Sequence, residues 1–346
     1  MVHIGIVGAG AAAAAAAFVI DRTLPDAEVT VLEKSGGVCG RAATRRHDDL
    51  VYDYGANYIK SDDDRVVDLL TETLDTDGLV DVSEPIYTFD ESGAVTPGRS
   101  ADDHKWSYEH GLTQVAKRLF GATDATVHRR TRVESLARTK EGWTMEATDG
   151  GSWGPFDIVG LNPPAPQTAE LLAATDWDDK RLPTLREAVE SVEYRPIWTA
   201  VLRYPFRLDR PYYALVNPGK DHDVGWIARE ECKAGHVPDD GESLLVVQAS
   251  AQWSAANYDA DPAENVAELA SLTADVVGDE RLAEPVWTDH QGWRYALPED
   301  GVRRGPVSAA AEAGLYCLGD WVAGEGRLHA ALAEGLAVGE QIVHAQ

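Results

Sequence analysis

Apolar runs separated by polar turns predict strand and helix units at both ends of the chain, with a strand-rich region between them. Residues 2–7 (VHIGIV) are a short β-branched run that is typical of a buried parallel strand. A Gly-rich turn and a run of alanines follow, and they predict a helix from Gly10 to Leu24 that ends before Pro25. Residues 28–32 (EVTVL) predict a second strand. The chain therefore begins with a βαβ unit.

The remaining elements follow from the same reasoning. Helices are expected from about Ser61, over 112–120, from Asp261 to Val277 and over 328–345, each with one apolar face or clear end signals. Segments 126–148 and 156–161 look like strands of a meander, residues 192–250 are mainly strand, and residues 314–319 form a last strand. This order predicts an α/β protein in which a nucleotide-binding domain is interrupted by a second domain.

The charge of the chain excludes some functions. The 346 residues include 58 Asp and Glu against 31 Lys and Arg, a formal net charge of −27. Such a surface argues against general nucleic-acid binding and against anionic membranes, both of which need basic residues. No uncharged apolar stretch is long enough to predict a membrane span. Because the acidic residues are spread along the chain and Arg outnumbers Lys, we predict a cytoplasmic protein from a salt-filled cell, where salt screens self-repulsion.

Cysteine usage and the first residues support a reduced intracellular chain. Cys39, Cys232 and Cys317 are far apart and odd in number, so neither a disulfide framework nor a zinc site is expected, and we predict no metal. The first residues read as a strand rather than a signal peptide.

The turn after the first strand carries the spacing of a dinucleotide-binding fingerprint, Gly8-x-Gly10-x-x-Ala13. Gly8 permits the tight turn, Gly10 allows backbone to approach a pyrophosphate, and Ala13 lets helix and strand lie close. The helix start then presents unpaired N–H groups to the phosphates. Glu33 ends the second strand, where its carboxylate can accept bonds from a ribose diol.

Three further segments point to a particular dinucleotide. Residues 33–46 (EKSGGVCGRAATRR) and 53–58 (DYGANY) follow the second strand, and residues 317–327 (CLGDWVAGEGR) lie near the C-terminus. They resemble elements of the flavin amine-oxidase superfamily, and DYGANYI, LNPPAPQTAELL, VVQASAQWSAANY, GWRYALP and GLYCLGDW resemble its renalase-like branch over essentially the whole chain. The resemblance implies noncovalent FAD, a glutathione-reductase-like FAD-binding Rossmann domain and a mixed-sheet α+β substrate domain.

The domains and cofactor residues are assigned from that resemblance. The FAD-binding domain is expected over 1–60, 107–165 and 300–346, and the substrate domain over 61–106 and 166–299. Arg41 is expected to pair with a phosphate and Asp320 to bond the ribityl or pyrophosphate region. The expected cofactor-binding residues are Gly8, Ala9, Gly10, Ala11, Ala12, Ala13, Glu33, Lys34, Gly40, Arg41, Gly55, Ala56, Asn57, Val133, Gly319, Asp320, Arg327, Leu328 and Ala331.

The substrate pocket is harder to assign. Candidates are Asn57, Tyr58, His290, Trp293, Arg294 and Tyr295, with Trp106, Trp253 and Lys60 as further possibilities. Aromatic residues would form an apolar cage, although core packing is their commoner role, while His290 and Arg294 could bind an anionic group. The sequence departs from the branch at Asn57, at His110-Gly111-Leu112 and at Gln291-Gly292, which puts the substrate in doubt.

The resemblance implies an oxidase that takes hydride from a small reduced substrate, such as a dihydronicotinamide-like dinucleotide, to the flavin, with oxygen as acceptor. Two alternatives stay open: an amine oxidase or desaturase on another small substrate, and a redox-neutral isomerase or mutase, which also uses this fold. The partners expected are a small molecule and oxygen. The sequence does not indicate the oligomeric state.

Overall fold

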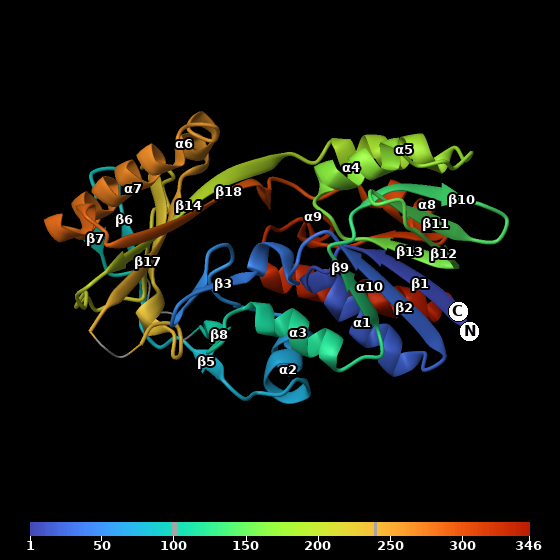
Figure 1. Ribbon diagram of the computed structural model, residues 1–346, viewed down its shortest axis with the longest axis horizontal. Coiled ribbons are helices and arrows are strands. Elements are labelled where there is room, and N and C mark those ends of the chain that lie inside the picture. Colours follow the sequence, from blue (N-terminus) through green and yellow to red (C-terminus); the bar gives the residue numbers. More distant parts are fainter. Residues whose placement is uncertain (99–102, 239–240) are drawn as a thin grey trace.

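The chain folds into two lobes, each built on its own sheet, and the long strands β14 and β18 run from one lobe toward the other (Figure 1). The computed structural model describes residues 1–98, 103–238 and 241–346. Both termini lie at the far end of the lobe that contains β1, β2 and α10 (Figure 1). We call this the N-terminal lobe, and the lobe with α7 the second lobe. No helix among the described residues is long and apolar enough to cross a membrane.

A five-stranded parallel sheet forms the centre of the N-terminal lobe. Its order is β19 (Leu315–Cys317), β13 (Ile158–Leu161), β1 (Val2–Val7), β2 (Ala27–Glu33) and β9 (Thr126–Arg129). Because parallel strands end at the same edge, the residues that follow β1, β2, β13 and β19 meet there. Gly8, Asn162 and Leu318 directly follow β1, β13 and β19, and Glu33 is the last residue of β2.

Helices cover one face of this sheet and a meander covers the other. The helical face consists of α1 (Ala11–Thr23), α3 (Thr113–Gly121) and α10 (Leu328–His344). The opposite face carries the antiparallel strands β10 (Val133–Arg138), β11 (Trp143–Ala147) and β12 (Ser152–Phe156), with α4 (Ala165–Ala173), α5 (Arg181–Glu190) and α8 (Arg304–Ala311). Helices α1 and α10 approach so closely that a Cβ atom at Gly335 would lie 2.2 Å from the Ala12 carbonyl oxygen. The small residues of α1 permit this approach.

The second lobe is a seven-stranded mixed sheet. Its order is β18 (Trp287–Pro298), β14 (Tyr194–Tyr204), β17 (Ser243–Ala249), β16 (Val224–Arg229), β15 (Ala214–Val216), β6 (Ile86–Phe89) and β7 (Val95–Thr96), with only β15 and β6 parallel. Helix α7 (Pro262–Val277), capped by Asp261, and α6 (Ala251–Ala256) share a core with one face. The hairpin of β3 (Thr44–His47) and β4 (Leu50–Asp53) packs at the other face.

The remaining elements are short. Helix α2 (Asp64–Asp68) continues into a π-turn over Leu69–Thr73, β5 (Leu79–Asp81) pairs with β8 (Trp106–Tyr108), and α9 (Asp320–Ala323) precedes α10. Single 3₁₀ turns cover Gly40–Ala42, Glu230–Cys232 and Glu280–Ala283.

The fold differs from the sequence expectation in several places. Strands β9 and β13 belong to the parallel sheet and not to the meander. The helix expected from Ser61 begins at Asp64, because the Asp63 side chain accepts from the Arg65 N–H and caps it there. Helices α4 and α5 were not among the helices expected from the sequence.

The expected domain boundaries differ as well. Residues 166–190 were assigned to the substrate domain, yet Leu171, Leu172 and Leu185 are buried with Trp143 in the core of the N-terminal lobe. Residues 61–106 are divided: α2 packs in the core that contains α1 and α10, whereas β6 and β7 join the sheet of the second lobe. The apolar faces of these segments decide which lobe each one packs against. The order of strands and helices along the chain does not predict how those faces are oriented.

Candidate functional site

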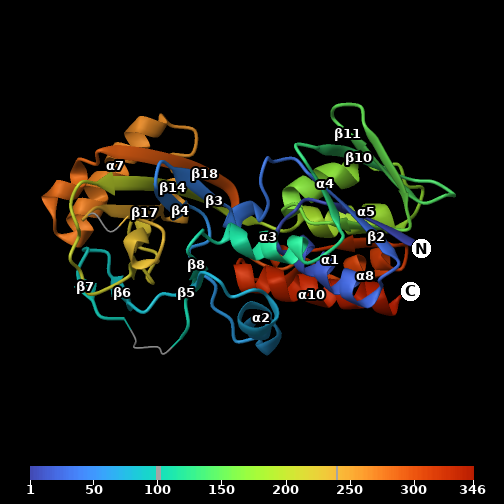
Figure 2. The ribbon, with the colours of Figure 1, turned by 60° about the horizontal axis from the view of Figure 1, so that its bottom comes forward.

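A cavity of about 2020 Å³ lies between the two lobes, bounded by the end of the parallel sheet and by the face of the seven-stranded sheet. Figure 2 shows the two lobes side by side. Both terminal motifs line this cavity, together with the segment 54–58 that follows β4. Of the expected cofactor residues, Ala9 and Ala13 do not line it, because both are fully buried.

The Gly-rich turn is held by the carboxylate at the end of β2. Glu33 accepts hydrogen bonds from the Ala9 N–H and the Ser35 N–H, each at 2.7 Å, and its residue is only 8% exposed. Gly8 has a φ of +90°, which favours glycine, and Gly10 precedes α1. Glu33 therefore already stabilises the turn, a role that sequence reasoning did not assign to it.

A residue that the sequence did not single out also contacts this turn. The side-chain oxygen of Asn162 accepts from the Gly10 N–H at 3.0 Å, and a Cβ at Gly10 would lie only 2.4 Å from it. Asn162 follows β13, so the shared edge of a parallel sheet was the signal that could have found it.

The main chain of the loop after β2 is accessible from the cavity. Gly37 and Gly40 line it, and a Cβ atom at either position would meet nothing within 4 Å. Gly40 also has a φ of +55°. A ligand can therefore approach the main chain closely at this point.

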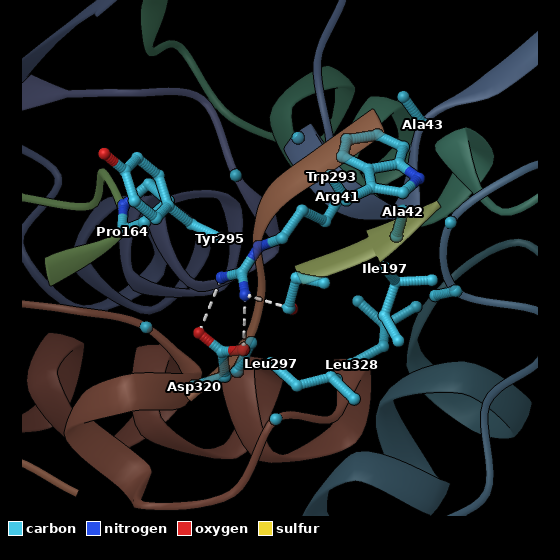
Figure 3. Close-up of a pocket in the computed structure, with 18 of the residues that line it drawn as sticks. Arg41, Ala42, Ala43, Pro164, Ile197, Trp293, Tyr295, Leu297, Asp320 and Leu328 are labelled. Carbon is cyan, nitrogen blue, oxygen red and sulfur yellow. Dashed lines mark hydrogen bonds and ion pairs between the residues drawn. The ribbon is translucent and has the colours of Figure 1, made fainter. Parts of the chain in front are cut away.

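Arg41 and Asp320 form a two-bond ion pair across the cavity wall (Figure 3). Arg41 Nη2 lies 2.6 Å from Asp320 Oδ1, and Nη1 lies 2.9 Å from both Asp320 Oδ2 and the Ala296 carbonyl oxygen. Burial works to lower the pKa of Arg41, but the charge and hydrogen bonds of Asp320 raise it above its usual value. Arg41 was expected to pair with a phosphate; in the structure a carboxylate and a carbonyl occupy its guanidinium.

The remaining cofactor candidates surround the same space. Lys34 lines it and donates to the side chain of Gln167, and Val133 lies at the start of β10. At the opposite end, Arg327 precedes α10 and Leu328 begins it. The set that lines the cavity is Gly8, Gly10, Ala11, Ala12, Glu33, Lys34, Gly40, Arg41, Gly55, Ala56, Asn57, Val133, Gly319, Asp320, Arg327, Leu328 and Ala331.

Residues 54–58, which we call the wall segment, are fixed by side chains of the second lobe. Trp293 donates to the Tyr54 carbonyl at 3.0 Å and stacks on the Tyr54 ring with centroids 5.2 Å apart. Gln248 donates to the Gly55 carbonyl at 2.7 Å. The Tyr213 hydroxyl donates to the Asn57 carbonyl at 3.4 Å. Sequence reasoning missed Gln248 and Tyr213, because both lie within or beside apolar strands that read as core.

The aromatic candidates divide between cavity and core. Tyr58, Trp293 and Tyr295 line the cavity, and Trp226, which was not a candidate, joins them 6.2 Å from the Tyr58 ring. Burial raises the pKa of Tyr58, while Arg327 and Lys60 lower it in part, so both cations lie near its hydroxyl.

Trp106 and Trp253 are buried and do not line the cavity. Trp253 instead donates to Glu268. These two candidates are core residues.

The two basic candidates have different positions. Arg294 lines the cavity, lies over the Tyr258 ring and is 3.4 Å from Asp259. His290 does not line the cavity: it is exposed, and its ring stacks on Trp198, a residue of the core that includes α7, with centroids 5.2 Å apart. The expectation that His290 faces the substrate is therefore wrong, because its position in β18 directs it to Trp198. Lys60 lines the cavity and pairs with Asp103.

The charge of the cavity departs from that of the chain. The described residues of the second-lobe wall contribute Arg195, Lys220 and Arg294 to the cavity, against one carboxylate, Glu299, which lies 2.9 Å from Arg195 Nε. The chain as a whole has almost twice as many acidic as basic residues. This wall therefore favours an anionic ligand over a cationic one.

Comparison with known proteins supports the first part of this description. The family of NAD(P)-binding Rossmann-like domains matches residues 6–73, which include the last two residues of β1, α1, β2 and the wall segment. That match covers the dinucleotide-binding unit alone.

Solved structures resemble the whole chain. A candidate protoporphyrinogen oxidase from Exiguobacterium sp. 255-15 has a TM-score of 0.78 at 16% identity, over 100% of this chain and 99% of its own. A putrescine oxidase bound to putrescine has a TM-score of 0.73 at 15% identity, over 99% of both chains. A fatty acid isomerase from P. acnes has a TM-score of 0.71 at 13% identity, over 98% of both. These proteins share the fold of this chain.

Proposed function

We propose that the protein is an FAD-dependent oxidoreductase acting on a small molecule. The observation that supports this most directly is that one cavity joins the Gly-rich turn, the end of β2 and the start of α10 to an aromatic wall from the second lobe. An extended dinucleotide needs the first set of features, and a substrate needs the second. Proteins with this fold include two named as oxidases, which agrees with the proposal.

The residues of the cavity fit such a cofactor. The first N–H groups of α1, at Ala11 and Ala12, have no partner within the helix and would bind a pyrophosphate. Glu33 would accept from ribose hydroxyls, and the open space beside Gly37 and Gly40 leaves room for close approach. FAD bound here would supply hydride acceptance at N5 of its ring and transfer of the electrons to oxygen, giving hydrogen peroxide.

The chain itself would orient the reaction and exclude water. Trp293, Tyr58 and Tyr295 provide flat apolar surfaces, and the start of α10 would stabilise negative charge beside it. A hydride donor held by stacking needs orientation more than an acid–base pair. Lys60, the candidate for holding a water, is already paired with Asp103.

We further propose that the substrate is an anionic hydride donor of the dihydronicotinamide dinucleotide class. Arg195, Lys220 and Arg294 outnumber Glu299 at this wall, and the excess of positive charge favours such a donor over a dication like putrescine. The amine oxidase and the redox-neutral isomerase stay as alternatives. Peroxide formed in proportion to substrate consumed would exclude the isomerase.

The cofactor proposal is tested with the purified protein. We expect a yellow protein whose absorption spectrum is that of oxidised flavin and whose FAD is released intact by mild denaturation. Protein that stays colourless after incubation with excess FAD, while remaining folded by circular dichroism, would contradict the assignment.

The substrate proposal is tested by anaerobic flavin bleaching with dihydronicotinamide isomers and with putrescine. Arg294→Ala is expected to raise the dinucleotide concentration for half-maximal bleaching about 3- to 10-fold, as expected for loss of one partly exposed charge contact. Arg303→Ala is the matched control, because Arg303 has the same 56% side-chain exposure and an acidic partner but does not line the cavity. Bleaching by putrescine alone would overturn the substrate class and leave the flavoenzyme proposal intact.

A further inference from the structure

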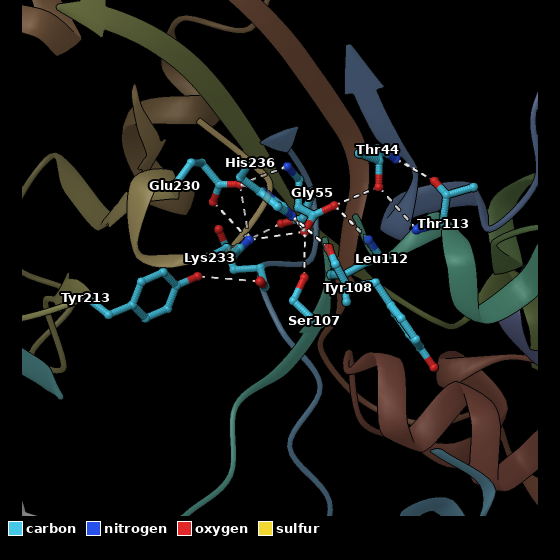
Figure 4. A network of polar contacts seen from close by, with 12 residues as sticks. Thr44, Gly55, Ser107, Tyr108, Leu112, Thr113, Tyr213, Glu230, Lys233 and His236 are labelled. Carbon is cyan, nitrogen blue, oxygen red and sulfur yellow. Dashed lines mark hydrogen bonds and ion pairs between the residues drawn. The ribbon is translucent and has the colours of Figure 1, made fainter. Parts of the chain in front are cut away.

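A fully buried cluster of charged side chains lies behind the wall segment (Figure 4). Its members are Asp53, Glu230, Lys233 and His236, and their side chains are 0% exposed. Lys233 Nζ lies 3.1 Å from Asp53 Oδ2 and 2.9 Å from Glu230 Oε1. None of the four lines the cavity. The proposed reaction therefore leaves this cluster unexplained.

The oxygen and nitrogen atoms of Asp53, Glu230 and His236 are close enough to surround a metal ion. The ammonium group of Lys233 already lies between the two carboxylates. His236 Nε2 is 3.0 Å from the Tyr108 carbonyl, which can only accept, so this nitrogen carries a hydrogen and its Nδ1 faces Glu230 Oε2 at 2.7 Å. The chain thus supplies its own cation at this position.

Each bond of Asp53 connects a different part of the fold. Oδ1 accepts from the Leu112 N–H at 2.9 Å and from the Thr44 hydroxyl at 2.7 Å, and the Asp53 N–H donates to Glu230 at 3.2 Å. The His236 carbonyl accepts from the Val51 N–H at 2.8 Å. The cluster therefore fastens the end of β4 to the second lobe and to the segment after β8.

The wall segment begins at the residue after Asp53. Its carbonyl groups are held on the other side by Trp293, Gln248 and Tyr213, and Tyr213 lies beneath Lys233 with 6.0 Å between Nζ and the ring centroid. A change in the position of Lys233 would thus move both the start of the wall and the hydroxyl that holds Asn57.

We propose that Lys233 is a positioning residue: its ammonium group fills a cation site formed by Asp53 and Glu230, whose carboxylate His236 also holds, and so fixes residues 54–58 as a wall of the cavity. A buried ion pair of this kind does not need to add stability, since apolar replacements are often as stable. Its role here is to select one arrangement of the wall. The effect on catalysis rests on the proposed function, whereas the effect on the wall does not.

The first test compares Lys233→Met with Leu269→Ala. Lys233→Met leaves two carboxylates without their cation, and we expect its melting temperature to fall by about 4–7 °C. Leu269 is a fully buried residue of α7 that does not line the cavity, so Leu269→Ala is a comparably destabilised control. Hydrogen exchange measured by mass spectrometry should accelerate over 51–60 and 107–112 in Lys233→Met, and over neither segment in Leu269→Ala.

The second test separates positioning from stability. The triple variant Asp53→Asn, Glu230→Gln, Lys233→Met removes the charges together, and we expect it to recover most of the lost melting temperature without restoring slow exchange over 51–60. Loaded with FAD and bleached by NADH, it should require a higher donor concentration for half-maximal bleaching than wild type does. Slow exchange and unchanged bleaching in the triple variant would overturn the proposal. Failure of every variant and of wild type to bind FAD would refute the proposed function only, because the exchange result does not depend on FAD.

Discussion

The hydrogen bonds of the Glu33 carboxylate lead to a prediction about the stability of the cofactor-free protein. It accepts two short backbone hydrogen bonds, from Ala9 and Ser35, and so ties the Gly-rich turn to the loop after β2. In Glu33→Gln the side-chain oxygen can satisfy one N–H, while the new amide group faces the other. The substitution therefore removes a charge-assisted bond and leaves a nearly buried N–H unpaired.

The magnitude follows from those two bonds. A hydrogen bond to a charged group contributes about 1.5–3 kcal/mol, and an unsatisfied buried donor costs about 1–3 kcal/mol. Since the two effects overlap, we expect Glu33→Gln to lower the free energy of unfolding of the cofactor-free protein by about 2–4 kcal/mol. For a chain of this size the melting temperature should fall by roughly 3–6 °C. Under the proposed function the dissociation constant for FAD should also rise about 10- to 100-fold.

The assay is thermal unfolding of the cofactor-free protein, followed by titration with FAD. Glu28→Gln is the control, because Glu28 lies on the same strand, is exposed and has only a loose contact of 3.7 Å with His3. Equal melting temperatures for the two variants would refute the role given to Glu33 in the turn. A lower melting temperature with unchanged FAD affinity would keep that role and remove the ribose contact.

Three other predictions test the fold and its charge. Gly335→Ala should lower the melting temperature by several degrees, because its Cβ would meet the Ala12 carbonyl at 2.2 Å, whereas Gly121→Ala, with nothing within 4 Å, should not. Burial would raise the pKa of Asp289, but hydrogen bonds from Tyr52 and Arg45 lower it below its usual value. In acid the unfolded chain therefore binds more protons than the folded chain, and the free energy of unfolding should decrease below about pH 4. Denaturant titrations should show a smaller decrease in Asp289→Asn. With a net charge of −27, the melting temperature should rise from dilute buffer to molar potassium chloride, and a flat profile would contradict the salt-adapted interpretation.

The elements near the chain ends were predictable because local signals suffice there. Strand β1, helix α1 and strand β2 follow from one β-branched run, one alanine run and the turn at Gly8. Helix α7 likewise has its cap at Asp261 and its left-handed end at Gly278. Strand β18 was missed, because its central residues are polar or aromatic and show no alternation of apolar positions.

The charged cluster could not have been found from the sequence. Asp53 and Lys233 are separated by 180 positions, and neither residue belongs to a motif with metal or catalytic spacing. Lys and Glu are residues that single-sequence reasoning assigns to the surface. Only the packing of β4 against the 3₁₀ turn at Glu230–Cys232 brings them together. The position of His290 was misjudged for a related reason, since strand register and not residue type decides which face a side chain takes.

Arg41 shows how the terminal motifs and the second lobe depend on one another. Its guanidinium bonds Asp320 from the C-terminal motif and the Ala296 carbonyl from β18. Its own carbonyl accepts from the Ala56 N–H at 3.1 Å, within the wall segment. The contact with Ala56 uses the backbone of Arg41 and does not depend on its side chain. The contacts with Asp320 and the Ala296 carbonyl require the guanidinium group. Arg41→Met would therefore leave the wall attached, while the Ala296 carbonyl loses this donor and Asp320 is left with an unpaired charge. For that reason weaker FAD binding in Arg41→Met alone would not demonstrate a phosphate contact. Because Asp320 is itself an expected cofactor residue, the informative comparison is between Asp320→Asn and the double variant Arg41→Met with Asp320→Asn, which differ only at Arg41.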